Sequence, residues 1–200
     1  MSVAREKKEL RLTAKAQRRG QAQAAVAAGA AEKLADNFSQ AGLDTPLNPS
    51  GAIAGYWPMS DEIDVRPLMA RLFDAGQTVA LPVVVAPEAP LIFRRWQPDM
   101  ALDAGGFGTF HPPGDPLGIN EPEIIPDLLL IPLLAFDTQG FRLGWGGGFY
   151  DRTLAGLRAA SPVIAVGVAY YGQQIDAVPH TPEDEVLDWI ITDEDVLEIR

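Results

Sequence analysis

Alternating apolar and polar segments along the chain predict an α/β fold. Short apolar runs rich in branched residues are typical of strands, and apolar residues spaced three or four apart are typical of helices. The expected strands are Ala52–Trp57, Thr78–Val85, Leu91–Trp96, Leu128–Leu134, Val163–Ala169 and Trp189–Thr192. The expected helices are 3–41, Asp64–Ala75 and Phe149–Ala160. This order predicts a single three-layer α/β/α domain over residues 1–200, with a mostly parallel central sheet.

The first 43 residues predict a helical segment that packs on this domain. Alanine is abundant and the first proline is Pro46, which favours a helix. Gly20 and Gly29 predict one or two breaks in it. By contrast, residues 97–126 are rich in Pro, Gly and Asp and predict a long loop. A loop of that length is uncommon in a compact domain, so we expect it to be functional.

The charge is negative overall and unevenly distributed. The net charge is −11, yet seven of the sixteen basic residues lie within the first nineteen positions. Two interpretations would explain this asymmetry: solvated helix faces, or a local anion site at one end of the chain. An acidic chain is a poor non-specific binder of nucleic acid, because phosphate backbones favour Lys and Arg.

Other compositional features exclude whole classes of chemistry. The chain has no cysteine and only two histidines, which excludes thiol catalysis, Cys-bound zinc and a three-histidine metal site. The longest apolar run, Leu128 to Phe136, contains Pro132 and is far shorter than the roughly 20 residues of a membrane helix. We expect a cytoplasmic protein that acts on small molecules without a membrane or nucleic-acid partner, as a monomer or weak homo-oligomer.

The strongest chemical signal is a glycine-rich segment between the most apolar strand and a helix. It contains Gly144, Gly146, Gly147 and Gly148. Glycines let a backbone approach a ligand closely, and N–H groups at a helix N-terminus form an anion cradle. Arg142 and Arg152 bracket the loop, and Asp151 is placed to reach a metal ion on the same phosphates. Glycines alone would more often form a plain turn, but such a turn needs neither the arginines nor the aromatics.

The segment Arg-Leu-Gly-Trp-Gly-Gly-Gly-Phe-Tyr-Asp-Arg at 142–152 resembles the signature of the 5-formyltetrahydrofolate cyclo-ligases. Three further blocks resemble that family in the same order, at 7–11, 56–64 and 184–192. Lys7 and Arg11 are four residues apart, so both fall on one helix face. Without the other blocks, a solvated face would be the simpler interpretation of that pair.

The resemblance implies an α/β enzyme that converts 5-formyltetrahydrofolate to 5,10-methenyltetrahydrofolate with ATP and Mg²⁺. It assigns ATP binding to Lys7, Arg11, Arg142, Gly144, Gly146, Gly147, Gly148, Phe149 and Tyr150. It assigns Mg²⁺ to Asp151 and Asp184, and catalytic roles to Arg142 and Tyr150. The folate is assigned to Glu62 and Tyr150, with Trp57, Phe107 and Trp145 as aromatics able to stack on it, although such residues are more often core.

Two departures from the family pattern leave questions open. Phe149 replaces the first tyrosine of the usual pair, so we expect that hydroxyl to be dispensable. In the long loop, His111 stands where the family commonly has Glu. His111 replaces that Glu at the folate, or Glu121 takes over its role, or neither residue reaches the ligand.

Two other classes of function remain as alternatives. A phosphosugar isomerase-like relative would use a carboxylate base and turn over without nucleotide. A non-catalytic folate- or nucleotide-binding protein would keep the binding loops but not hydrolyse ATP. The presence of Arg142, Asp151 and Asp184 favours catalysis.

Overall fold

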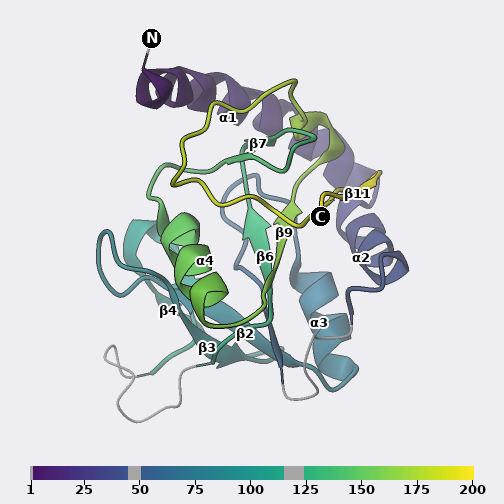
Figure 1. Ribbon diagram of the computed structural model, residues 1–200. Helices are drawn as coiled ribbons and strands as arrows, with labels where there is room; N and C mark the ends of the chain where they lie inside the picture. The colour runs from purple at the N-terminus through teal and green to yellow at the C-terminus, as the bar shows by residue number, and fades with distance from the viewer. Residues whose placement is uncertain (1, 45–50, 115–123) are drawn as a thin grey trace.

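A seven-stranded sheet forms the centre of the molecule in the computed structural model, which describes residues 2–44, 51–114 and 124–200 (Figure 1). The strand order is β11-β10-β9-β6-β1-β2-β3. The helices are α1 (Val3–Ala27), α2 (Ala30–Gln40), α3 (Arg66–Asp74) and α4 (Phe149–Ala160). The strands of the sheet are β1 (Ala52–Ala54), β2 (Thr78–Val83), β3 (Ile92–Trp96), β6 (Leu128–Pro132), β9 (Ile164–Val168), β10 (Trp189–Ile191) and β11 (Val196–Glu198).

The sheet is mostly parallel, as the sequence predicts. Strands β2, β1, β6, β9 and β10 run parallel to their neighbours, and only the two edge strands, β3 and β11, pair antiparallel. Strand β6 is buried on both faces, which explains its continuous apolar sequence,. The central strands therefore form a rigid base for the loops at their ends.

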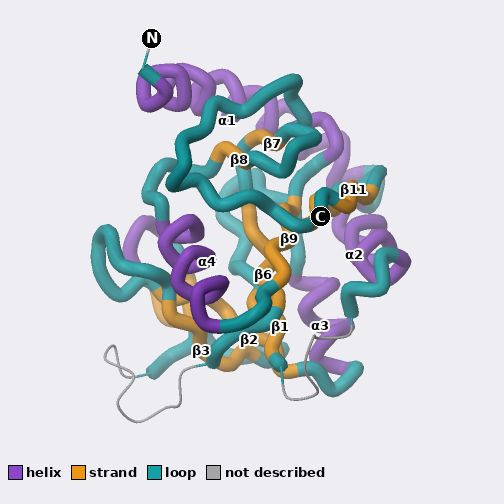
Figure 2. Tube along the Cα trace, in the orientation of Figure 1, coloured by secondary structure: helices purple, strands orange, loops and turns teal. Residues whose placement is uncertain are grey.

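Helices cover both faces of the sheet, which confirms the α/β class and its layering (Figure 2). Leu128 and Leu130 point to the face that α2 and α3 cover. Their neighbours Leu129 and Ile131 point to the opposite face, where they pack with Leu154 of α4. This alternation follows from the two-residue period of a strand.

Helix α1 lies across the carboxyl ends of the central strands (Figure 1). Ala14 packs there against Leu134 and Leu143. Of the one or two breaks expected at Gly20 and Gly29, the structure has the one at Gly29, at φ 77°, and α1 continues through Gly20 to Ala27. A helical glycine costs only about 1 kcal/mol relative to alanine, and the packing of α1 outweighs this.

Several element boundaries differ from the sequence prediction. Strand β1 ends at Ala54 instead of Trp57, and edge strand β11 was not expected. The long loop contains a small hairpin of β4 (Asp103–Ala104) and β5 (Phe110–His111) around the 3₁₀ turn η1 (Gly106–Gly108). The turn before the glycines holds a second hairpin, β7 (Ala135–Phe136) with β8 (Arg142–Leu143). These two-residue strands are too short to give a periodic signal.

The strand order reverses between β1 and β6, and this point locates the site. The chain passes from β1 to β2 on one side, whereas β6 pairs on the other side of β1. In open α/β sheets, ligands bind in the crevice beyond the carboxyl ends of the strands at such a reversal. The loops that leave β1 and β6 are therefore the expected walls of a binding site.

None of the helices in the described part of the chain is long and apolar enough to cross a membrane.

Candidate active site

A cleft of about 1030 Å³ opens at this reversal point. Its walls come from α1, from the loop after β1, from the η1 turn, and from the glycine loop with the start of α4. Every residue that the family resemblance assigns to ATP, Mg²⁺ or folate lines it: Lys7, Arg11, Trp57, Glu62, Phe107, Arg142, Gly144, Trp145, Gly146, Gly147, Gly148, Phe149, Tyr150, Asp151 and Asp184. Residues 177 positions apart in the chain thus meet in one cavity.

The glycine loop has a backbone that side chains would disrupt. Gly146 has φ +103° and Gly148 has φ +66°, and Gly148 is also the N-cap of α4. A Cβ atom at Gly146 would lie 3.1 Å from Cζ of Arg11, and one at Gly148 would lie 2.7 Å from Nη1 of Arg152. The positive φ therefore favours glycine at both positions, and at Gly146 the nearby Arg11 side chain adds a spatial restriction,.

Two cations from α1 reach this loop. Nε of Arg11 donates to the carbonyl oxygen of Gly144 at 2.9 Å. Nζ of Lys7 donates to both carboxylate oxygens of Asp184, at 2.5 and 2.6 Å. Burial alone would raise the pKa of Asp184, but Lys7 and the Thr181 N–H and hydroxyl groups hold it below its usual value. The shared helix face expected for Lys7 and Arg11 is thus the one that faces the cleft.

Arg142 links the two predicted metal ligands. Its buried guanidinium donates through Nη2 to Oδ1 of Asp151 at 2.5 Å and through Nη1 to the carbonyl oxygen of Glu185. The Glu185 N–H in turn donates to the same Asp151 oxygen at 3.1 Å. Burial lowers the pKa of Arg142, and the charge of Asp151 opposes this. Asp151 and the segment that carries Asp184 are therefore held together by direct contacts.

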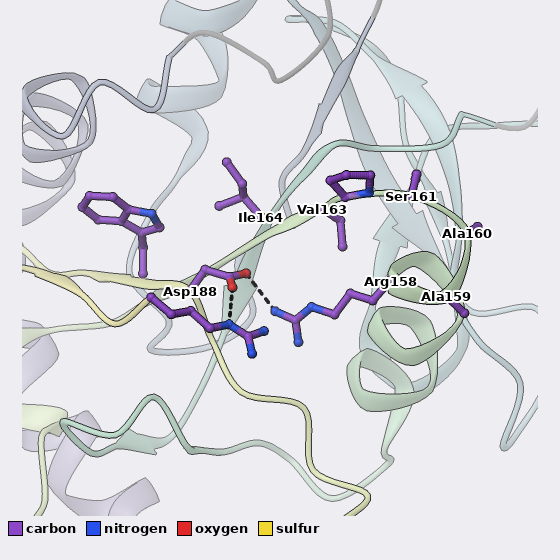
Figure 3. Close-up of a pocket in the computed structure, with 10 residues that line it drawn as sticks. Arg158, Ala159, Ala160, Ser161, Val163, Ile164 and Asp188 are labelled. Atoms are coloured by element: carbon purple, nitrogen blue, oxygen red, sulfur yellow. Dashed lines mark hydrogen bonds and ion pairs between the residues drawn. The ribbon is translucent and has the colours of Figure 1, made fainter.

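Arg158 fixes that segment from behind the cleft. It pairs with Glu185 at 2.5 Å. It also pairs with Asp188 at 2.8 Å (Figure 3), and Arg200 pairs with the same carboxylate. Arg158, Asp188 and Arg200 lie around a second, open hollow of about 550 Å³. Its arginines are neutralised by the carboxylates beside them, so we assign the chemistry to the first cleft and a supporting role to this network.

Glu62 forms the carboxylate wall at the other end of the cleft. Its Oε2 accepts the Met59 N–H and its Oε1 accepts the indole N–H of Trp145, both at 2.9 Å. Burial raises the pKa of Glu62, whereas those two hydrogen bonds and the charge of Arg18 act in the opposite direction. The contact with Trp145 joins the loop after β1 to the glycine loop.

Aromatic residues cover the space between these charged groups. Burial raises the pKa of Tyr150, so its hydroxyl stays protonated at neutral pH. Phe107, at φ 60°, projects from the η1 turn and makes an edge contact with Phe149 at 5.7 Å between ring centres. A positive φ at a bulky residue is strained, and such strain concentrates at functional sites.

The long loop reaches the cleft through its hairpin tip. Phe107, Gly108, Thr109 and Phe110 line the cleft, whereas His111, among the described residues of this loop, does not. Nδ1 of His111 lies 2.9 Å from the carbonyl oxygen of Pro112. Glu121, the alternative to His111, is outside the described residues.

Sequence reasoning did not identify two supporting arginines, Arg18 and Arg158. Arg18 interrupts a stripe of buried alanines at Ala14 and Ala22, spaced four residues apart. A charged residue on a buried helical stripe is a usable signal, because burying a charge requires a partner. Arg158 gave no such signal, because its partners are 27 and 30 residues away in the chain.

The donor set of the cleft fits a magnesium ion that phosphate oxygens complete. Within the described residues, no cluster of three or more His, Cys, Asp or Glu side chains could hold a metal alone. Mg²⁺ commonly takes one or two carboxylates plus phosphate and water oxygens. In the described part of the chain Asp151 accepts hydrogen bonds from Arg142 and Glu185, both at Oδ1, so its Oδ2 is available to a metal ion.

Comparisons with known proteins agree with this geometry. The model of the 5-formyltetrahydrofolate cyclo-ligase family matches residues 3–193. A 5-formyltetrahydrofolate cyclo-ligase of Mycolicibacterium smegmatis is 35% identical over 193 residues, 94% of each chain. That of Haemophilus influenzae is 38% identical over 132 residues, 64% of this chain and 67% of the relative.

A solved structure is similar as well. The 5,10-methenyltetrahydrofolate synthetase of Aquifex aeolicus superposes with a TM-score of 0.73 at 27% identity, over 97% of this chain and 93% of its own. The sequence match and the fold match cover the same cleft-forming segments, from α1 to the strand β10. The chain is an enzyme of folate one-carbon metabolism and belongs to the 5-formyltetrahydrofolate cyclo-ligase family.

Proposed function

We propose that the cleft binds 5-formyltetrahydrofolate beside ATP·Mg²⁺ and closes the folate ring to 5,10-methenyltetrahydrofolate, releasing ADP and phosphate. The observation that carries this proposal is the meeting of two unlike subsites in one cleft. A polyphosphate site, made of glycines and cations, adjoins a buried carboxylate, and the Trp145–Glu62 hydrogen bond joins them.

The phosphate subsite consists of the glycine loop, Lys7, Arg11 and Arg142. Backbone N–H groups at the start of α4 bind anions, because they lack helical partners and the helix dipole favours negative charge there. Arg142 uses two of its five N–H donors on protein groups,. The remaining donors are available to neutralise charge on the phosphoryl group in the transition state.

Magnesium, when bound, would neutralise phosphate charge and align the phosphoryl group for transfer. Asp151 and Asp184 would hold it. In the structure Lys7 donates to both oxygens of Asp184, so Lys7 would have to move toward the phosphates for Asp184 to hold the ion. Such an exchange of one cation for another would keep the charge of Asp184 compensated.

The folate subsite consists of Glu62, Tyr150, Trp57, Phe107 and Trp145. A carboxylate matched to two pterin N–H donors discriminates against analogues that lack them, because the buried acceptor would stay unpaired. Trp145 donates to the same carboxylate in the structure. The pterin must therefore displace that indole, which then becomes free to stack on the folate.

The residues of the chain align the two reactants and neutralise charge. The formyl oxygen attacks the terminal phosphorus atom and ADP leaves, which converts a poor leaving group into a phosphate ester. N10 then attacks the formyl carbon, its proton is lost, and phosphate departs with the former formyl oxygen. Alignment of this kind supplies most of the catalysis in phosphoryl transfer.

Product absorbance tests the proposal. The protein mixed with 5-formyltetrahydrofolate, Mg²⁺ and ATP should form the methenyl chromophore, and omission of ATP should abolish it. Turnover without ATP would favour the isomerase-like alternative. Tight folate binding without any product or ATP hydrolysis would favour the non-catalytic binder, and either result would refute the proposed reaction.

A further inference from the structure

Arg18 is a buried charged residue that the reaction above does not use. It is 1% exposed and lies on the buried face of α1 between Ala14 and Ala22. Burying a guanidinium is unfavourable unless groups of opposite charge or polarity compensate it. The position of Arg18 therefore requires an explanation from its surroundings.

The surroundings of Arg18 are the two loops that flank the strand-order reversal. Nη1 donates to the carbonyl oxygen of Leu133, after β6, at 3.2 Å. Nη2 donates to Oδ1 of Asp61, after β1, at 3.2 Å, and Nη1 lies 3.7 Å from Oε1 of Glu62. Within the described residues, its Nε has no hydrogen-bond partner. The guanidinium thus leaves a buried donor unused while it stands next to two carboxylates.

Glu62 needs a compensating cation at this place. Its side chain is 2% exposed, and burial is the largest influence on its pKa, in the upward direction. The charged and titratable groups that face it are Arg18 from α1, Asp61 from its own loop, Tyr56 after β1 and Tyr150 from α4.

Of these groups, Arg18 supplies the positive charge. Burial raises the pKa values of Tyr56 and Tyr150, so both stay neutral near pH 7. The charge of Asp61 favours protonation of Glu62, and the charge of Arg18 opposes it. Lys15 of α1 and Arg18 both lie over the ring of Trp145, at 4.5 and 5.0 Å from the ring centre. Of the two, Arg18 is the cation that acts on Glu62.

We propose that Arg18 is a positioning residue of the folate subsite, which keeps Glu62 ionised and directed into the cleft so that it can accept the pterin N–H groups. The inference rests on the proposed folate-binding role of Glu62. It adds that the N-terminal helix serves both subsites, with Lys7 and Arg11 at the phosphates and Arg18, about two turns further on, behind the pterin carboxylate.

Carboxyl ¹³C NMR of protein labelled at glutamate tests, without any ligand, whether Arg18 keeps Glu62 ionised. The Glu62→Gln variant assigns the signal. Glu62 of the wild type should remain ionised to lower pH than Glu62 of Arg18→Met. Arg18→Lys, which keeps the charge, should titrate close to the wild type. Arg18→Gln retains hydrogen-bond donors and replaces Arg18→Met should that variant not fold. Equal titration of Glu62 in the wild type and a neutral variant would overturn the proposal.

Folate affinity at several pH values tests whether the Glu62 charge that Arg18 maintains is used to bind the folate. The dissociation constant of the neutral variant, divided by that of the wild type, should rise as the pH falls from 8 through the Glu62 pKa of the variant and of the wild type, toward a limit of roughly tenfold for each unit by which that pKa has risen. Lys15→Met is the matched control, because it removes a cation that shares the Trp145 contact of Arg18 but does not pair with Glu62, and its ratio should be flat with pH. A flat ratio for the Arg18 variant would show a merely structural role and overturn the proposal.

The two measurements separate this inference from the proposed function. A wild-type protein that binds no 5-formyltetrahydrofolate would refute the proposed function, and the NMR titration would still decide whether Arg18 controls the charge of Glu62. A wild type that binds folate, together with unshifted titration in the Arg18 variants, would refute the Arg18 inference alone.

Discussion

The close contact between Arg11 and Gly146 limits the space available to an anion in the glycine loop. The loop carbonyl of Gly144 holds the Arg11 side chain, so this guanidinium cannot easily withdraw from a group added at position 146. Because Gly146 also has a positive φ, any side chain there meets both strain and a close contact.

Gly146→Ala should weaken ATP binding by roughly tenfold or more and leave folate binding nearly unchanged. A Cβ there would lie 3.1 Å from Cζ of Arg11, so Arg11 or the loop must shift by tenths of an ångström, and a positive φ adds about 1 kcal/mol of strain. Isothermal titration calorimetry with each ligand measures both effects. Gly156→Ala is the control, since a Cβ at that helical site meets nothing within 4 Å. Unchanged ATP affinity in Gly146→Ala would contradict the assignment of the loop to phosphate.

At the level of elements, α4 and the segment 184–188 form one unit. The first turn of α4 carries Asp151, and its last turn carries Arg158. Arg158 reaches Glu185 and Asp188, while Arg142 and Asp151 hold the backbone of Glu185 from the other side. The placement of Asp184 therefore depends on a helix whose contacts with it are indirect.

Arg158→Met should raise the Mg²⁺ concentration needed for half-maximal activity by several-fold. Loss of both ion pairs frees the segment that carries Asp184, whereas the folate wall at Glu62 is untouched. Initial rates over a Mg²⁺ titration, with the Michaelis constant for folate measured alongside, give the comparison. Arg200→Met is the control, because Arg200 contacts Asp188 from a more exposed position and does not pair with Glu185. An identical Mg²⁺ titration for Arg158→Met and the wild type would rule out this role.

Some of these elements could be predicted from the sequence and others could not, because some depend on local residue patterns and others on contacts between distant segments. Strand β6 and helix α4 were predictable because their apolar patterns are local, and the glycine loop because its residue types are unusual. The strand order, the two small hairpins and the Arg158 network depend on contacts between distant segments. Lys7 was predictable as a cation on a helix face, but its pairing with Asp184 needed the fold that brings α1 over the sheet.

For the whole molecule, the pair of Lys7 and Asp184 fastens the start of α1 to the opposite end of the chain. Because the pKa of Asp184 is lowered in the folded state, its carboxylate stabilises the fold above the unfolded pKa, near 3.9. This contribution is lost as the pH falls through the lower, folded pKa. The site and the attachment of α1 are thus coupled through one carboxylate.

Lys7→Met should lower the free energy of unfolding by about 1 kcal/mol or less at pH 7, since the pair is partly screened by solvent. The difference from the wild type should shrink toward zero as the pH falls below about 3.8, the ordinary value for Asp. Urea unfolding at pH 7, 5 and 3 measures it. Arg5→Met, which removes an exposed pair with Glu9 on the same helix, should have a smaller effect at pH 7. A Lys7→Met difference that grows on acidification would contradict the sign of this coupling.

In the proposed reaction the formyl oxygen of the substrate is phosphorylated in this cleft and leaves as part of the released phosphate. Substrate labelled with ¹⁸O in the formyl group, mixed with unlabelled ATP, Mg²⁺ and water, tests it in a single measurement. Mass spectrometry of the phosphate should find one ¹⁸O atom for each methenyl product formed. Unlabelled phosphate formed together with the methenyl product would contradict the claim, because the oxygen would then have left as water, separately from ATP hydrolysis.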